Sequence, residues 1–130
     1  MNQELVHKPN PQPKSVLVVD DDLECRYTLA YGLREAGYAV YEAVNASEAL
    51  RLITSPLSFD AVITDVQMPG EIDGMLLAET IRATLPAVTI VVVSGLDFSE
   101  TLAASGITFF QKPYRIGLVI EHLDRSLKTK

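Results

Sequence analysis

The sequence predicts a doubly wound α/β domain, in which helices cover both faces of a parallel β-sheet. Two observations lead to this fold class. Short segments alternate regularly with longer segments of helical periodicity, and several of the short ones are apolar at nearly every position. Continuous apolar runs of strand length are typical of strands buried on both faces. Because five such strands alternate with five helices, we expect all the strands to be parallel.

The expected strands are rich in β-branched and other apolar residues, as strands in a packed sheet usually are. The segment 88–93, Val-Thr-Ile-Val-Val-Val, has this composition most clearly. The predicted strands are Ser15–Val19, Tyr38–Ala43, Ala61–Thr64, Val88–Val93 and Ile107–Gln111.

The expected helices carry apolar residues three and four positions apart, and several stop at glycine or proline. Tyr27, Ala30 and Leu33 have this spacing in the first helix, and Gly37 follows it as a stop signal. A short helix fits between the last two strands. The predicted helices are Leu23–Ala36, Ala46–Thr54, Gly74–Leu85, Ser99–Ser105 and Ile116–Leu127.

The chain of 130 residues, with an apolar content of 48%, is sufficient for one domain with its own core. We expect this domain to span residues 15–130. Residues 1–14 alternate proline with polar residues, which is typical of a flexible, extended tail. No apolar run is long enough to span a membrane, and the net charge of −6 argues against a nucleic-acid surface on the domain.

Cys25 is the single cysteine of the chain, so it cannot form an internal disulfide bond. The start of the chain also lacks the basic and then apolar profile of a secretory signal. Together these features predict a reducing, cytoplasmic environment. Cys25 falls in the first predicted helix, where burial is a simpler expectation than redox chemistry.

Chemically active side chains gather at the carboxyl ends of the predicted strands. Ligands of open parallel sheets bind at this edge, where the strand order reverses. The second strand ends in Glu42-Ala43 and offers no group to the chemistry. The other four strands are followed by acids, a hydroxyl or an ammonium group: Asp20-Asp21-Asp22, Asp65, Ser94 and Lys112.

These groups suit phosphoryl transfer. Carboxylates held close together repel one another unless a cation intervenes, and a few oxygen ligands completed by water suit Mg²⁺. A carboxylate can also act as a nucleophile and form an aspartyl phosphate. A lysine ammonium, a hydroxyl and a metal ion would then stabilise the charge on the transferred group.

Each residue also has a simpler interpretation by itself. Asp22 is expected to cap the following helix, and Asp65 alone would be a turn residue. Ser94 alone would be an ordinary strand-end hydroxyl, and Lys112 alone a solvated surface charge. The functional interpretation depends on the set, because four chemically matched strand ends do not readily arise by chance.

Four segments resemble the receiver domain of two-component response regulators. Any one of these motifs is weak by itself, but their order across residues 15–127 is highly specific. The resemblance implies the flavodoxin-like strand order 2-1-3-4-5. The segments are Val-Leu-Val-Val-Asp-Asp-Asp (16–22), Ile-Thr-Asp-Val-Gln-Met-Pro-Gly (63–70), Val-Val-Val-Ser-Gly (91–95) and Phe-Phe-Gln-Lys-Pro-Tyr (109–114).

The resemblance implies a role for each residue of the set. Asp65 would be the phosphoacceptor, and Lys112 would pair with the phosphoryl oxygens. Ser94 would be the switch hydroxyl that moves toward the phosphoryl group. Asp20 and Asp21 would form the acidic pair, with Asp21 binding Mg²⁺ directly and Asp20 mainly through water.

Three further positions match the family. Gln67 would offer its backbone carbonyl to the Mg²⁺ ion that Asp65 also contacts. Pro113 would follow Lys112 in a cis peptide bond. Phe109 matches the switch aromatic of the family, and simple core packing explains it equally well.

Two segments depart from the family pattern. The loop from Pro69 to Gly74 is one residue longer than usual, which should alter the surface beside Asp65. Only 17 residues, 95–111, separate Ser94 from Lys112, so we expect a short or irregular fourth helix. Many receivers form homodimers or bind partners through the surface that includes this helix, and we expect that surface to differ here.

By this resemblance, the chain takes a phosphoryl group from a sensor histidine kinase or a phosphotransfer protein and switches its contacts with an output partner. It would not be an enzyme with a separate substrate, because it would catalyse only its own phosphorylation and dephosphorylation. The alternative is a receiver-fold binding module that is regulated by protein contact without phosphorylation. The complete set of site residues argues against that alternative.

Two other classes of protein fit less well. A phosphatase with its nucleophile on the first strand would prefer Asp-x-Asp-x-Thr from Asp20, but position 24 is Glu24. A flavin-binding domain of the same architecture would place the flavin phosphate against the acids at the strand ends. Carboxylates there would repel that phosphate unless a metal ion intervened.

Overall fold

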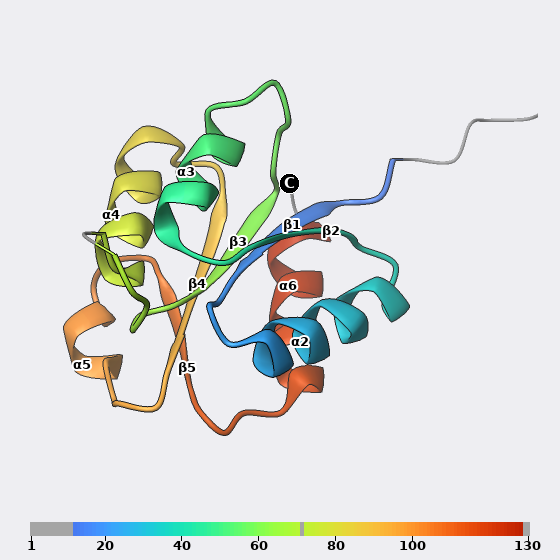
Figure 1. Ribbon diagram of the computed structural model, residues 1–130. Coiled ribbons are helices and arrows are strands. Elements are labelled where there is room, and N and C mark those ends of the chain that lie inside the picture. The colour runs from blue at the N-terminus through green and yellow to red at the C-terminus, as the bar shows by residue number, and fades with distance from the viewer. Residues whose placement is uncertain (1–11, 71, 129–130) are drawn as a thin grey trace, which may run out of the picture.

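Strands and helices alternate throughout the residues that the computed structural model describes, 12–70 and 72–128 (Figure 1). The strands are β1 (Ser15–Val19), β2 (Ala39–Ala43), β3 (Ala61–Asp65), β4 (Thr89–Ser94) and β5 (Thr108–Gln111). The helices are α2 (Leu23–Glu35), α3 (Ala46–Ile53), α4 (Gly74–Thr84), α5 (Ser99–Leu102) and α6 (Ile116–Lys128).

The predicted elements are all present, and their bounds agree within one residue except in α5. The prediction extended this helix to Ser105, but the helix ends at Leu102. Most of the predicted tail, residues 1–11, lies outside the described residues. At its end, the Lys14 carbonyl accepts a 2.9 Å hydrogen bond from the Ala39 amide, so the pairing of β1 with β2 begins one residue before β1.

The five strands form one parallel sheet in the order β2-β1-β3-β4-β5, which confirms the predicted topology. The chain winds first from β1 to β2 on one side and then to β3 on the other, so the strand order reverses between β1 and β3. The register aligns the strand ends: Asp65 lies opposite Val93, and Ser94 opposite Gln111. Side chains at these ends therefore share one edge of the sheet.

Helices cover both faces of the sheet, with α2 and α6 on one face and α3, α4 and α5 on the other (Figure 1). The inner strands β1, β3 and β4 are buried along almost their whole length, whereas the edge strands β2 and β5 are half-buried. Burying one valine, leucine or isoleucine contributes about 1.5–3 kcal/mol. The continuous apolar runs of the inner strands therefore anchor the fold and hold the strand ends in place.

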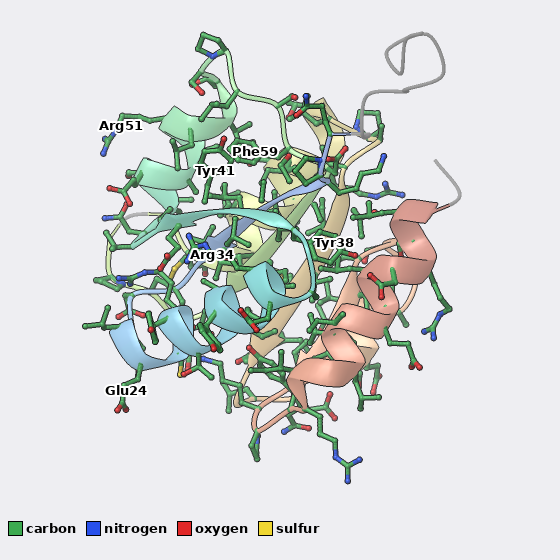
Figure 2. All side chains as sticks on the ribbon, turned by 90° about the vertical axis from the view of Figure 1, so that its right-hand side faces the viewer. Glu24, Arg34, Tyr38, Tyr41, Arg51 and Phe59 are labelled. Atoms are coloured by element: carbon green, nitrogen blue, oxygen red, sulfur yellow. The ribbon has the colours of Figure 1, made fainter. Side chains whose placement is uncertain are left out.

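The outer edge of β2 packs through aromatic side chains. Tyr41 meets Phe59 edge to face at 5.3 Å between ring centroids, and the Tyr38 hydroxyl donates a hydrogen bond to Asp124 of α6. Figure 2 labels Tyr38, Tyr41 and Phe59, together with Arg34 of α2, which donates a hydrogen bond to the Val40 carbonyl of the same strand. Among the described residues, no helix combines the length and the apolar character that a membrane-spanning helix needs.

Candidate functional site

The first acidic residues lie in the turn between β1 and α2. Asp22 caps α2, because its carboxylate accepts hydrogen bonds from the amides of Glu24 and Cys25 at 2.9 and 3.2 Å. Asp20 is buried, and its carboxylate accepts the Asp22 amide at 2.9 Å. Asp21, between them, is exposed. The structure thus confirms that Asp22 caps α2. The same turn holds the Asp20 side chain in the interior and leaves Asp21 exposed to solvent.

Asp65 is the last residue of β3, with 8% of its surface exposed. Its backbone is fixed from two directions. The Thr64 hydroxyl donates to the Asp65 carbonyl at 2.9 Å, and the next amide, of Val66, donates to the Val93 carbonyl at 3.1 Å. These bonds hold the peptide units around Asp65 at the end of the buried strand.

Gly74, the first residue of α4, lies against the backbone of Asp65. A Cβ atom at position 74 would stand 1.7 Å from the Asp65 carbonyl oxygen, far inside van der Waals contact. The Gly74 amide donates to the Val66 carbonyl at 2.9 Å, which closes the loop after β3. Because a side chain has no room there, glycine is required for this approach of α4 to Asp65.

Lys112 reaches this group from the end of β5. Its ammonium nitrogen lies 3.5 Å from Oδ2 of Asp20 and 3.5 Å from Oδ1 of Asp65. The peptide bond between Lys112 and Pro113 is cis, and the Lys112 amide donates to the Ser94 carbonyl at 2.8 Å. One cation therefore links two carboxylates that are 45 residues apart in the sequence.

The charges of the site shift the pKa values of its groups. Burial raises the pKa of Asp65, the Lys112 ammonium lowers it and the Asp20 carboxylate raises it, with a net increase. Burial lowers the pKa of Lys112, but the carboxylates of Asp20 and Asp65 outweigh that effect and raise it. Lys112 therefore stays a cation, while Asp65 sits in surroundings that disfavour its charge.

Oxygen atoms of Asp20, Asp21 and Asp65 all lie within 4.8 Å of one another. Carboxylate oxygens at this separation suit a small hard cation such as Mg²⁺. The repulsion among them also favours a cation, since Lys112 supplies one positive charge to three acids. The donor set therefore fits the predicted metal.

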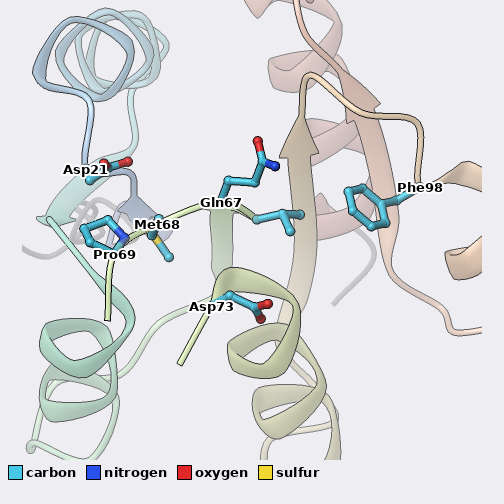
Figure 3. Close-up of a pocket in the computed structure, with 7 residues that line it drawn as sticks. Asp21, Gln67, Met68, Pro69, Asp73 and Phe98 are labelled. Carbon is cyan, nitrogen blue, oxygen red and sulfur yellow. The ribbon is translucent and has the colours of Figure 1, made fainter. Parts of the chain in front are cut away.

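A shallow hollow opens beside Asp21. Its walls come from the loops after β1, β3 and β4, and Gln67, an exposed residue, stands between Asp21 and Phe98 in Figure 3. The lining residues are Asp21, Val66, Gln67, Met68, Pro69, Asp73 and Phe98. A small molecule or a protruding side chain can approach Asp21 from this side. Glu71 of the lengthened loop lies outside the described residues.

The two predicted switch residues form no side-chain hydrogen bond or ion pair with this group among the described residues. Ser94 is fully buried, and its hydroxyl accepts the Leu96 amide at 3.1 Å. Phe109 is half-buried and meets Phe98 edge to face at 6.2 Å, packed against the core. Ordinary hydrogen bonding and packing explain the placement of Ser94 and Phe109, so their roles as switch residues stay predictions.

Sequence reasoning missed two residues beside the acids. Glu42 of β2 accepts from Nε of Arg26 at 3.1 Å, and Nη1 of Arg26 donates to the Asp20 carbonyl at 2.8 Å. The second strand was expected to offer nothing to the site. An acidic side chain on a strand that is expected to be buried needs a charged or hydrogen-bonding partner. Glu42 was therefore the signal in the sequence that such a partner exists. Cys25 nearby is half-buried, and burial raises the pKa of its thiol.

Comparison with known proteins places this geometry in context. Residues 16–124 match the family model described as the response regulator receiver domain. The response regulator MprA of Mycolicibacterium vanbaalenii is 37% identical over 108 residues, which cover 80% of this chain and 46% of that protein. An NtrX-like response regulator of Rickettsia typhi is 31% identical over 120 residues, covering 88% and 25% respectively. The chain spans a quarter to a half of these relatives.

Solved structures of receiver proteins have the same fold as this chain. The response regulator TrrA of Thermotoga maritima, in complex with Mg²⁺ and BeF, has a TM-score of 0.79 at 30% identity and covers 88% of this chain and 99% of its own. The receiver domain of the hybrid histidine kinase CckA has a TM-score of 0.73 at 33% identity, covering 87% and 98%. Unlike the full-length relatives, both structures are matched over nearly their whole length.

Proposed function

This chain belongs to the response regulator receiver domain family, and on that premise we propose that Asp65 accepts a phosphoryl group in a two-component phosphorelay. The observation that carries the proposal is the convergence of Asp65, Asp20 and Lys112 at one end of the sheet, with two 3.5 Å contacts from a single ammonium group. Acceptance and loss of this group would change the contacts that the domain makes with other proteins.

In the proposed reaction, a carboxylate oxygen of Asp65 attacks the phosphorus atom of the donor. The new O–P bond forms as the bond from phosphorus to the leaving group breaks, and the leaving group departs with the electron pair. Lys112 stabilises the negative charge on the phosphoryl oxygens. Asp20, Asp21, Asp65 and the Gln67 carbonyl would hold Mg²⁺, which supplies further positive charge when bound.

The donor would be a sensor histidine kinase or a phosphotransfer protein, because the chain's relatives are response regulators. The open hollow beside Asp21, whose wall includes Val66 next to Asp65 in the sequence, is where a donor side chain would approach. The curated relatives continue beyond the matched region, and one of them, PrrA of Mycobacterium tuberculosis, is named a transcriptional regulatory protein. An output protein or domain is therefore the expected recipient of the signal, in the cytoplasm.

Ser94 is the proposed link from phosphorylation to the surface. Its hydroxyl holds the Leu96 amide in the loop before α5, and the Leu96 side chain is 56% exposed. If the hydroxyl turns toward a phosphoryl group on Asp65, that loop loses its hydrogen bond and shifts. Phe109, packed against Phe98 of the same segment, would follow the change.

Incubation with Mg²⁺ and acetyl phosphate, followed by intact-mass measurement, tests the proposal. The wild-type chain should gain one phosphoryl group, and Asp65→Asn should gain none. Asp73→Asn is the matched control, because Asp73 lines the same hollow and asparagine can replace it as the cap of α4. A wild-type chain that gains no mass would favour a binding module regulated by contact alone.

A further inference from the structure

Arg26 of α2 joins the acidic turn to strand β2. Its side chain is only 12% exposed. Nε donates to the Glu42 carboxylate at 3.1 Å, and Nη1 donates to the Asp20 carbonyl at 2.8 Å. A guanidinium group can make both bonds at once because its donors form a rigid fork.

The Asp20 carbonyl belongs to the peptide unit that connects Asp20 to Asp21. Its orientation decides how Asp21 is presented beside Asp20 and Asp65. The preceding amide, of Asp20 itself, donates to the Ala43 carbonyl at 3.1 Å. The end of β2 therefore holds Asp20 twice, once through the backbone of Ala43 and once through Glu42 and Arg26.

Glu42 is itself held in place. Its second carboxylate oxygen accepts from Nη1 of Arg34 at 3.1 Å, and Nη2 of Arg34 donates to the Val40 carbonyl at 2.9 Å. Arg34, labelled in Figure 2, is 45% exposed and lies in the last turn of α2, whereas the acids of the turn precede the first. The Glu42 carboxylate thus pairs with two arginines. Arg26 also reaches the acidic turn, and Arg34 does not.

We propose that Arg26 is a positioning residue for metal binding, which fixes the peptide between Asp20 and Asp21 and is itself fixed by Glu42. This inference rests on the proposed function of the acidic group. It gives β2 a part in the site, although no side chain of β2 touches the metal-binding acids. Residues that orient metal ligands typically change metal affinity by roughly 10–100-fold when they are removed.

The direction of the change in Mg²⁺ affinity distinguishes a positioning role of Arg26 from a purely electrostatic one. Removing a cation near three acids should, by charge alone, strengthen the binding of Mg²⁺. Removing the group that orients Asp20 and Asp21 should weaken it. Arg26→Met and Arg34→Met remove the same charge and both break a pair with Glu42, but Arg26→Met alone frees the Asp20 carbonyl.

Calorimetric titration with MgCl₂, without a phosphodonor, measures the affinity of the complete chain and of each variant. We expect Arg26→Met to weaken Mg²⁺ binding by about tenfold. Arg34→Met should leave the affinity within about twofold, because exposed charges are screened by solvent. Thermal unfolding of each variant shows whether it is folded during the titration.

Arg26→Lys provides a second variant that keeps the charge. If Arg26→Met does not fold, Arg26→Lys decides the matter: weaker Mg²⁺ binding supports positioning, because one ammonium cannot reproduce the fork. Unchanged or tighter Mg²⁺ binding in a folded Arg26 variant, beside a wild-type chain that binds the ion, overturns this inference alone. A wild-type chain that binds no Mg²⁺ overturns it together with the metal site of the proposed function.

Discussion

The proposed acceptor site and the segment that carries α5 both begin at the carboxyl ends of strands, but they are built differently. This acceptor site, defined by Asp20, Asp21, Asp65 and Lys112, stands on the ends of three strands. Hydrogen bonds to neighbouring strands and from Arg26 fix its backbone. The α5 segment, residues 95–107, contains a helix of four residues whose buried residue is Leu102. Among the described residues, no side-chain hydrogen bond caps that helix at Phe98.

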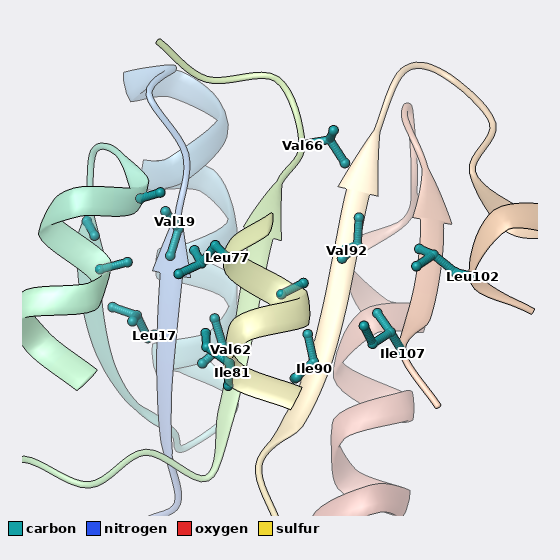
Figure 4. Close-up of a cluster of buried hydrophobic side chains, with 14 residues drawn as sticks. Leu17, Val19, Val62, Val66, Leu77, Ile81, Ile90, Val92, Leu102 and Ile107 are labelled. Atoms are coloured by element: carbon teal, nitrogen blue, oxygen red, sulfur yellow. The ribbon is translucent and has the colours of Figure 1, made fainter. Parts of the chain in front are cut away.

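Contacts of the α5 segment with the rest of the molecule lie at the margin of the core. Figure 4 shows Leu102 and Ile107 beside β4 and β5, apart from the residues that surround Leu77. Arg82 of α4 adds a polar connection, because its Nε donates to the Ser105 carbonyl at 3.0 Å. The difference indicates that the proposed chemistry depends on the rigid strand ends, whereas this weakly anchored segment can change its conformation while the strand ends stay in place.

Gly74→Ala should have the largest effect, because it forces α4 away from Asp65. The added Cβ would overlap the Asp65 carbonyl oxygen, so we expect the free energy of unfolding to fall by about 3 kcal/mol or more. Gly117→Ala is the control: its Cβ meets nothing within 4 Å, and alanine favours helix by up to about 1 kcal/mol. Urea unfolding compares the two variants, and equal stabilities would contradict the account of α4.

Lys112→Met should affect the chemistry more than the fold. Loss of a group that stabilises transferred charge typically slows a reaction by roughly 10²–10³-fold, so we expect phosphorylation by acetyl phosphate to slow about 100-fold. Mg²⁺ binding should become tighter, since the acids lose their internal cation. A variant phosphorylated at the wild-type rate would show that Lys112 is not part of the reaction.

Arg82→Met should loosen the α5 segment and leave the acceptor site unchanged. We expect a loss of about 1 kcal/mol, together with faster hydrogen–deuterium exchange in residues 99–107. Exchange in 61–66 should match the wild-type chain. Arg51→Met, at an exposed arginine of α3, serves as the control. Faster exchange in both regions would mean that loosening the α5 segment also loosens the strand ends.

The smallest effect should come from His122 on α6, outside both regions. Burial and the neighbouring Arg125 lower the pKa of His122, so the folded chain binds its proton more weakly than the unfolded chain. The neutral form of His122 therefore favours the folded state. This stabilisation is complete above the unfolded pKa of about 6.5 and is lost as the pH falls through the folded pKa. His122→Gln should flatten that part of the pH–stability profile, and an unchanged profile would contradict the assignment.

Sequence periodicity was sufficient for the helices and strands, because burial on both faces leaves continuous apolar runs. The end of α5 was not predictable in this way. The Ser105 hydroxyl donates to the Leu102 carbonyl, and Gly106 adopts a φ of +81°, so a turn replaces the last part of the predicted helix. Local patterns do not distinguish such a turn from a continued helix.

The strand-end rule brought the acids and Lys112 together correctly, because parallel strands align their carboxyl ends. It could not find Arg26 or Gly74. Arg26 acts through Glu42, which lies 16 residues away on another element. The need for glycine at position 74 depends on how closely α4 packs against Asp65. Both are properties of packing between elements and leave no local signature.

Locating the phosphoryl group on the chain tests the proposed role of Asp65. The chain is phosphorylated with acetyl phosphate and Mg²⁺ and reduced with borohydride, which converts an aspartyl phosphate to homoserine. Peptide mass mapping then identifies the modified residue. We expect homoserine at position 65 and aspartate at positions 20 and 21. Homoserine at position 20 or 21, or unmodified Asp65 in a chain that has gained a phosphoryl group, would contradict it.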